Sequence, residues 1–321
     1  MLYTGTISQL KTVMMKMRNL GLSALALLTA WFYFVYIPKA VQTVVPLPLD
    51  GTPADVGLRF EEFSLSPADT DLQLAGWWMP AENPRANLVF IHGAGSNRYS
   101  RFFSSLDFYA AMVERGISVS VVDLRNHGLS GSDGEGLGMG TTEKWDALAL
   151  IDWTRARSPE LPLFAMGISM GGATLIHAGA HGADINGLIL LDPLLDTHSA
   201  IVQGVWIQSG LPAGLFMPSA WAATTFYNLP GGEQQAANLA ADLDIPMLLL
   251  QDPEDPVTLA VHARALAAAN PAIRYRELPA ADDAQQTLLS WRGRWGSHVA
   301  AFFLFPEQVV AEITAFMGLS N

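Results

Sequence analysis

The chain has 321 residues, half of them hydrophobic, no cysteine and a formal net charge of −12. This length is enough for one large α/β domain or two small ones. The acidic balance disfavours a nucleic-acid partner, and the lack of cysteine excludes disulfides, thiolate metal sites and a cysteine nucleophile.

The first distinctive feature is an uncharged stretch at 20–37, LGLSALALLTAWFYFVYI. As a helix it would be roughly 27 Å long, close to the hydrocarbon thickness of a bilayer. Basic residues precede it at 11, 16 and 18, and only Lys39 follows closely. The positive-inside rule therefore places segment 1–19 in the cytoplasm. The sequence predicts a signal anchor, with the rest of the chain on the periplasmic or extracellular side.

Two other interpretations of 20–37 stay open at this point. A cleaved signal peptide is disfavoured because the apolar run is long and IPKAVQ is a poor cleavage site. A buried helix is disfavoured because four prolines follow within 38–53, which predict an extended linker at 38–57. We expect a single globular domain at 58–321.

The domain begins with two strands, at 58–65 and 72–79, joined by a polar turn and expected to pair antiparallel. Apolar strands then alternate with helices, which predicts an α/β fold with a mainly parallel sheet covered on both faces. The expected strands are 87–91, 117–122, 163–166, 187–191, 247–250 and 273–278. The expected helices are 101–114, 141–157 with Thr141 or Thr142 as N-cap, 170–179 and 306–317.

A serine bracketed by glycines marks the candidate site, in GISMGG at 167–172. A strand that turns sharply into a helix can hold a side chain at its apex, provided that its neighbours are small enough for the strand and helix to approach. Gly167, Gly171 and Gly172 meet that requirement. The pattern predicts Ser169 as a nucleophile, with the Met170 N–H at the helix start available to an oxyanion.

The nucleophile needs a base and an acid, expected in the chain order Ser, acid, His. Of seven histidines, only His298 follows the last predicted strand, in WGSHVAAFF. The acid should follow the penultimate strand, in PMLLLQDPEDPV. We favour Asp255, because a turn through the next proline would direct its carboxylate sideways; Asp252 is the alternative. The loop HGAGSNR supplies the second oxyanion donor, Ala94, with Gly95 as the next choice.

The motifs together resemble the α/β-hydrolase superfamily. They are HGAG at 92–95, DLRNHGLS at 123–130, GISMGG at 167–172, DPV at 255–257 and SH at 297–298. The resemblance implies an eight-stranded sheet, a Ser–Asp–His triad and a cap after the sixth strand, which 195–232 would form. It implies a structural role for DLRNHGLS. A weaker resemblance is to the membrane-anchored Bem46-like and serine-aminopeptidase-like branches.

Two features depart from the family pattern. The family often has His–Gly before the acid, where this chain has Gln251–Asp252, and 280–296 intervenes between the last strand and His298. The stretch 280–296 contains two tryptophans and is too long for a simple connection.

The expected activity is hydrolysis of a carboxylic ester with a lipophilic acyl group, from a small molecule or a lipid. The aromatic cap and the membrane helix favour it, with Trp206, Trp221 and Trp295 as candidate substrate contacts. A peptidase or amidase of the same fold and a non-catalytic anchored scaffold are the alternatives. No metal or other cofactor is expected, and the oligomeric state stays open.

Overall fold

A computed structural model describes residues 3–319, so the ends of the expected segments 1–19 and 58–321 lie outside the described residues. One eight-stranded sheet forms the centre, in the order β1-β2-β4-β3-β5-β6-β7-β8. The first three strands in this order pair antiparallel and the others pair parallel, as predicted. The strands are Glu61–Leu65, Leu74–Met79, Ala86–Ile91, Ile117–Val122, Leu163–Ile168, Gly187–Leu191, Met247–Gln251 and Arg274–Glu277.

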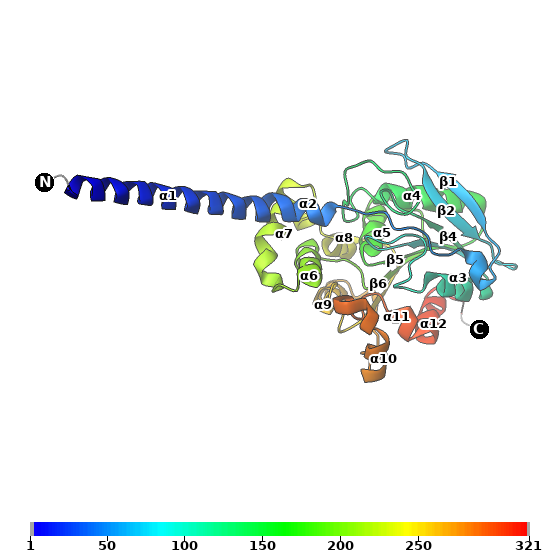
Figure 1. The fold of residues 1–321 in the computed structure, drawn as a ribbon. Helices are drawn as coiled ribbons and strands as arrows, with labels where there is room; N and C mark the ends of the chain where they lie inside the picture. The colour runs from blue at the N-terminus through cyan, green and yellow to red at the C-terminus, as the bar shows by residue number, and fades with distance from the viewer. Residues whose placement is uncertain (1–2, 320–321) are drawn as a thin grey trace.

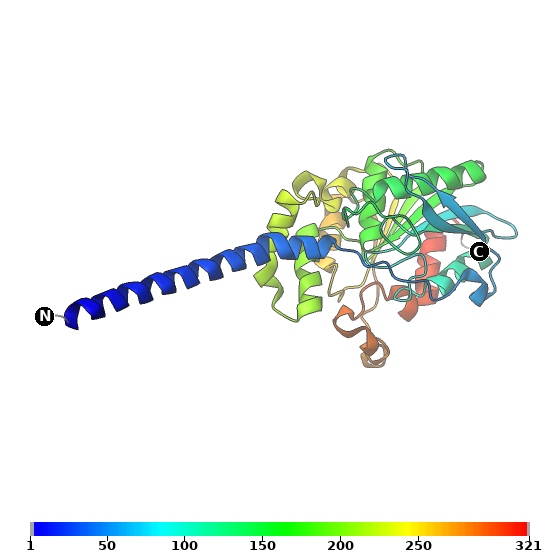
Figure 2. The ribbon, with the colours of Figure 1, turned by 45° about the horizontal axis from the view of Figure 1, so that its top comes forward.

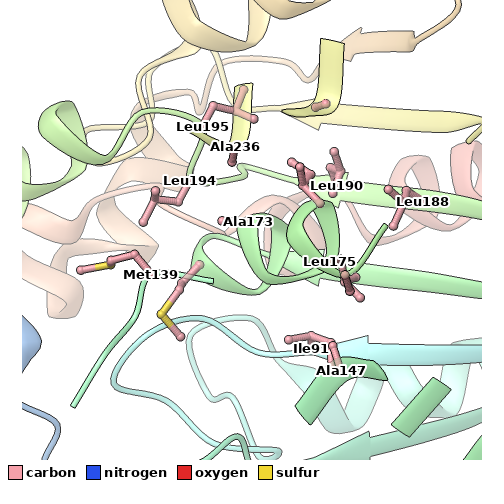
Figure 3. Packing of buried hydrophobic residues seen from close by; sticks show 14 of the residues in the cluster. Ile91, Met139, Ala147, Ala173, Leu175, Leu188, Leu190, Leu194, Leu195 and Ala236 are labelled. Carbon is pink, nitrogen blue, oxygen red and sulfur yellow. The ribbon is translucent and has the colours of Figure 1, made fainter. Parts of the chain in front are cut away.

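Helices cover both faces of the sheet (Figure 1), because successive side chains of a strand point to opposite faces. In β3, Leu88 and Phe90 pack into one buried cluster, whereas Val89 and Ile91 pack into the other. Figure 3 shows the second cluster around α5. The helices of the domain core are α3 (Ser105–Glu114), α4 (Lys144–Arg157), α5 (Met170–Ala180), α8 (Ala236–Asp242), α9 (Ala260–Ala269) and α12 (Pro306–Phe316).

Two helix starts differ from the prediction. The helix expected from 101 begins at Ser105, and the one expected from 141 begins at Lys144, with Glu143 at the N-cap position in place of Thr141 or Thr142. The buried Glu143 carboxylate instead accepts hydrogen bonds from the N–H groups of Gly138 and Gly140, at 2.8 Å each. The residue types that usually cap helices did not predict this contact between Glu143 and the preceding loop.

Between β6 and β7 the chain forms a helical cap, at the position expected for 195–232. It contains α6 (Thr197–Ser209), η3 (Ala213–Phe216), α7 (Met217–Phe226) and η4 (Gly232–Gln234). The stretch 280–296 is also helical, with α10 (Asp283–Leu288) and η5 (Ser290–Trp295), and α11 (Ala301–Leu304) follows it. The cap lies at the end of the domain from which the N-terminal helix leaves (Figures 1 and 2).

The N-terminal helix is longer than predicted. It continues from α1 (Tyr3–Trp31) through a π-helical turn, η1 (Phe32–Tyr36), into α2 (Ile37–Gln42). The first residues of the expected linker at 38–57 are therefore helical rather than extended, as far as Gln42, and Pro38 is buried. Residues 11–31, before the π-helical turn, are exposed, which overturns the buried-helix interpretation. Among the described residues, Lys11–Gln42 is the one unbroken helix long and apolar enough to cross a membrane.

Candidate active site

Ser169 lies at the sharp turn between β5 and α5. Its backbone has φ 51° and ψ −121°, a left-handed conformation that costs free energy for any residue except glycine. A Cβ on Gly167 would lie 2.3 Å from the carbonyl oxygen of Gly171, and one on Gly171 would lie 2.2 Å from that of Ile91. The glycines are therefore required by the close approach of helix and strand, as the sequence predicted.

Of the three residues predicted as a triad, His298 lies within hydrogen-bond distance of both others. His298 Nε2 is 3.1 Å from Ser169 Oγ, and His298 Nδ1 is 2.7 Å from Asp255 Oδ2. All three side chains are buried, with Ser169 9% exposed. They come from the β5–α5 turn, the loop after β7 and the segment before α11. This arrangement can transfer a proton from the serine hydroxyl to the imidazole.

The carboxylate of Asp255 is fixed by its own loop. Its Oδ1 accepts the N–H groups of Val257 and Thr258 at 2.7 and 2.8 Å, and its Oδ2 also accepts the Thr258 hydroxyl. The alternative acid, Asp252, accepts the Glu254 N–H and has no hydrogen bond to His298 among the described contacts. Burial raises the pKa of Asp252. The geometry therefore brings Asp255 rather than Asp252 to the imidazole.

The stretch 280–296 lies in sequence between the last strand and His298. In the structure it holds this histidine in place. The buried Arg292 guanidinium donates to the carbonyl oxygens of His298, Gly296 and Phe102 at 2.8, 2.9 and 3.1 Å. The Trp295 ring stacks on the His298 imidazole with centroids 5.9 Å apart. Burial lowers the pKa of Arg292 to about 10, and the nearby Asp255 and Asp192 partly offset this effect.

Sequence reasoning missed Asp192, which follows β6 and is fully buried. Its Oδ1 accepts the N–H of Asp252 at 2.7 Å and its Oδ2 accepts that of Val299 at 3.2 Å. It therefore ties the acid loop to the histidine segment. Burial, then the neighbouring carboxylates, raises its pKa well above the usual value. An aspartate directly after the apolar run LILL was the available signal.

Each of the two predicted oxyanion donors follows a residue of the serine turn or its neighbourhood: Met170 follows Ser169, and Ala94 follows Gly93. Met170 is the first residue of α5, so its N–H has no acceptor within the helix. The N–H of Gly95, the second choice on the other loop, is used by His127 Nε2 at 3.1 Å. Ala94 is exposed, and the adjacent Gly93 lies beside Ser169, where a Cβ would be 3.2 Å from the serine Cβ.

The segment DLRNHGLS is structural, as the resemblance implied. The Asp123 carboxylate forms a buried ion pair with Arg98, and Arg125 forms ion pairs with Asp69, Asp133 and Asp146. Despite the Arg125 partner, burial raises the pKa of Asp146 to about 6. These contacts fix the loops beside the site.

Comparisons with known proteins agree with this fold. The serine aminopeptidase S33 family model matches residues 82–222, which include Ser169 but neither Asp255 nor His298. Among solved structures, the Pyrococcus furiosus esterase Pf2001 has a TM-score of 0.68 at 18% identity, covering 86% of this chain and 98% of that one. The chain has the α/β-hydrolase fold.

In sequence, part of the chain is similar to lipases. It is 32% identical over 134 residues to the monoglyceride lipase of Rattus norvegicus, covering 40% of this chain and 41% of that one. The matched region spans less than half of the length of each curated relative. Est1E from Butyrivibrio proteoclasticus, solved with ferulic acid, has a TM-score of 0.56 at 16% identity, covering 79% of this chain and 97% of that one.

The three tryptophans predicted to contact substrate lie in different places in this fold. Trp295 stacks on the imidazole of the site, and Trp206 is half-buried in α6. Trp221 lies instead on the outer side of the cap, 6.3 Å from the Phe34 ring of the N-terminal helix. It lines a cap cavity of about 560 Å³ that includes no triad residue. The geometry therefore separates Trp221 from Ser169.

Proposed function

We propose that this chain is a serine hydrolase that cleaves a carboxylic ester with a lipophilic acyl group. The observation that carries the proposal is the position of His298, whose two ring nitrogens contact Ser169 Oγ and Asp255 Oδ2. A serine hydroxyl becomes nucleophilic when such a base accepts its proton. A complete triad also argues against the non-catalytic scaffold.

The proposed reaction has two steps. In the first, Ser169 Oγ attacks the ester carbonyl while His298 Nε2 takes the hydroxyl proton, and the N–H groups of Met170 and Ala94 stabilise the oxyanion. The imidazolium then gives its proton to the leaving alcohol, and an acyl-serine remains. In the second, His298 activates a water molecule that releases the acid. Asp255 holds the imidazole in the productive tautomer throughout.

The cap supports an apolar substrate. No Asp, Glu, Lys or Arg occurs from Thr197 to Gly232, so α6, η3 and α7 offer no carboxylate that would bind the free amine of a peptide, and Glu233 in η4 is the one carboxylate of the cap helices. The names of the monoglyceride lipase and esterase relatives favour the same substrate class. The description of the family model as a serine aminopeptidase keeps peptide hydrolysis as the second candidate.

The contacts of the N-terminal helix with the domain favour a permanent anchor over a cleaved signal peptide. Ile37 is buried in the domain, and Gln42 Nε2 donates to the carbonyl oxygens of Leu137 and Tyr227 at 3.3 and 3.1 Å. Cleavage after the apolar stretch would remove the buried Ile37 and would separate Gln42 from the helix that leads into it. The basic residues before the helix favour a domain on the non-cytoplasmic side.

The test is hydrolysis of p-nitrophenyl esters with acyl chains of two to sixteen carbons by the full chain in detergent. We expect activity that rises with acyl length and falls at least about 10³-fold in Ser169→Ala. Asp255→Asn should lower the rate strongly, and Asp252→Asn is its matched control. Aminoacyl p-nitroanilides test the second candidate in the same assay.

Either of two results would overturn the ester proposal: equal rates for Ser169→Ala and the natural chain, or turnover of the anilides alone. A fluorophosphonate probe that labels the natural chain and not Ser169→Ala would show that the serine is reactive even if the tested esters are poor substrates.

A further inference from the structure

The outer side of the cap carries an exposed apolar surface, which we call the cap face. It consists of Leu211, Leu215, Met217, Trp221 and Phe226, each at least half exposed. The inner side of the same helices is different, because Ile201, Phe216 and Ala220 pack into the domain core. Exposed apolar surface of this kind marks a binding surface on a folded protein.

The composition of the cap is that of a membrane-contacting element. The helical segments Thr197–Ser209 and Ala213–Phe226, bent by 119°, are together as apolar as a broken membrane span. The stretch from Thr197 to Gly232 has no charged residue, although charged residues make up 15% of the chain. Since its inner side is packed in the core, the segment has only its outer side available for lipid.

The cap face is continuous with the N-terminal helix. The Trp221 ring lies 6.3 Å from Phe34 and 5.4 Å from Phe226, and Phe216 lies 6.2 Å from Tyr33. In both ribbon views α1 leaves the domain beside α7 (Figures 1 and 2). The surface therefore surrounds the point at which the helix enters the domain.

The depth of these contacts can be deduced from the charges that flank the apolar helix. Residues 19–38, between Arg18 and Lys39, are uncharged and would be roughly 30 Å long as a helix, the thickness of the hydrocarbon layer. Phe34 lies about 8 Å along the helix from Lys39 and thus inside this stretch. Trp221, whose ring contacts that of Phe34, lies at the same depth, near the end of the hydrocarbon layer, where tryptophan and tyrosine are enriched in membrane proteins.

We infer that the cap face lies in the interfacial layer of the same bilayer that α1 crosses, so that cap and helix bind the membrane together. This inference rests on the membrane anchoring under the proposed function, and not on ester hydrolysis. A bilayer fits better than a protein partner because the face is apolar, aromatic and adjacent to a helix that is itself exposed and apolar.

The natural absence of cysteine allows single-cysteine labels. We would attach the fluorophore NBD to Leu215→Cys and Phe226→Cys in the full chain, reconstituted in phosphatidylcholine vesicles. Leu288→Cys on α10 is the matched control, since Leu288 is 59% exposed and Phe226 is 63% exposed. Ala26→Cys on α1 reports the anchor itself. Quenching by doxyl lipids measures contact with lipid, and quenching by iodide measures contact with water.

Labels at 215 and 226 should be quenched by shallow doxyl lipid at least twice as strongly as the label at 288, and less by iodide. If they respond to iodide as the label at 288 does, the cap face is in water and the inference is wrong. If neither quencher reaches them, a second copy of the chain covers the face, which also overturns it. A label at 26 that deep doxyl lipid does not quench would refute the anchor as well. None of these quenching measurements depends on ester hydrolysis.

Discussion

Arg292 is a buried cation whose hydrogen bonds go to backbone carbonyls rather than to carboxylates. Its guanidinium joins Phe102 near α3, Gly296 and His298, and so holds the backbone of the proposed base at a fixed position. A lysine has three donors on one nitrogen and cannot reproduce this forked geometry. Catalysis depends on the position of a base to within about 1 Å.

We predict that Arg292→Met lowers kcat for ester hydrolysis about 10- to 100-fold with little change in KM, because the imidazole loses its support while the acyl site is unchanged. Arg292→Lys should restore part of the rate. The second-order rate of Ser169 phosphonylation by a fluorophosphonate should fall in parallel.

The control variant is Arg294→Met, in the same segment. Arg294 donates to the Ile207 carbonyl of the cap and has no hydrogen bond to the His298 backbone among the described contacts. If Arg294→Met slows phosphonylation as much as Arg292→Met does, the effect belongs to the stability of the segment and not to His298.

At the scale of elements, the N-terminal helix is part of the cap as well as a membrane helix. Pro38 has no N–H to donate to the carbonyl of Phe34, four residues earlier. The Tyr227 hydroxyl at the end of α7 donates to this oxygen at 3.0 Å. Phe32, Tyr33 and Val41 pack against the core cluster that includes Ile37. A helix that continued past Pro38 without this support would lack a hydrogen bond.

Two truncated chains test this coupling. A chain that begins at Trp31 keeps η1 and α2, whereas one that begins at Val45 loses both. We predict that the chain from Val45 has a melting temperature at least about 5 °C lower in detergent, because the burial of Ile37 alone is worth roughly 2 kcal/mol. The melting temperature of the chain from Trp31 should stay close to that of the full chain.

Equal melting temperatures for the two truncated chains would show that the contacts of α2 with the cap contribute little. In that case the helix would be a tether attached to an independently stable domain.

For the whole molecule, three buried histidines lower the stability of the folded state in acid, and buried carboxyls with raised pKa values, such as Asp146, contribute in the opposite direction. Burial lowers the pKa of His92 to about 3 and that of His177 to about 4, and it lowers the pKa of His127 as well. In the unfolded chain the same groups would titrate near 6.5. As the pH falls below 6.5, the unfolded chain gains protons that the folded chain does not, so the folded state loses stability.

His177 offers the clearest test of this pH effect, because its Nε2 has no hydrogen-bond partner among the described residues. We predict that between pH 7 and pH 5 the natural chain loses about 2 kcal/mol of unfolding free energy relative to His177→Gln. Denaturant titrations of the two proteins at pH 7, 6 and 5 measure the difference.

His181→Gln is the matched control on the same helix, since His181 is exposed. A difference between the natural chain and His177→Gln that stays constant with pH would contradict the prediction.

The sequence by itself determined the features that depend on local sterics and periodicity. Gly167 and Gly171 indicated a close strand–helix approach because only a residue without Cβ fits there. Buried parallel strands such as β6 read as continuous apolar runs, and the bounds predicted for β6 agree with the structure. The order of Ser169 and His298 along the chain followed from the same alternation of strands and helices.

Only the tertiary structure decided the features that depend on contacts between distant segments. The turn chemistry favoured Asp255 over Asp252, but the contact with His298 that distinguishes them forms only where the loop after β7 meets the segment before α11. The contacts of Arg292 with the His298 backbone and of Pro38 with the cap have no periodic signal. Such contacts form because polar groups that are buried on folding need hydrogen-bond partners. The residues next to a polar group in the sequence do not specify which distant residue becomes its partner.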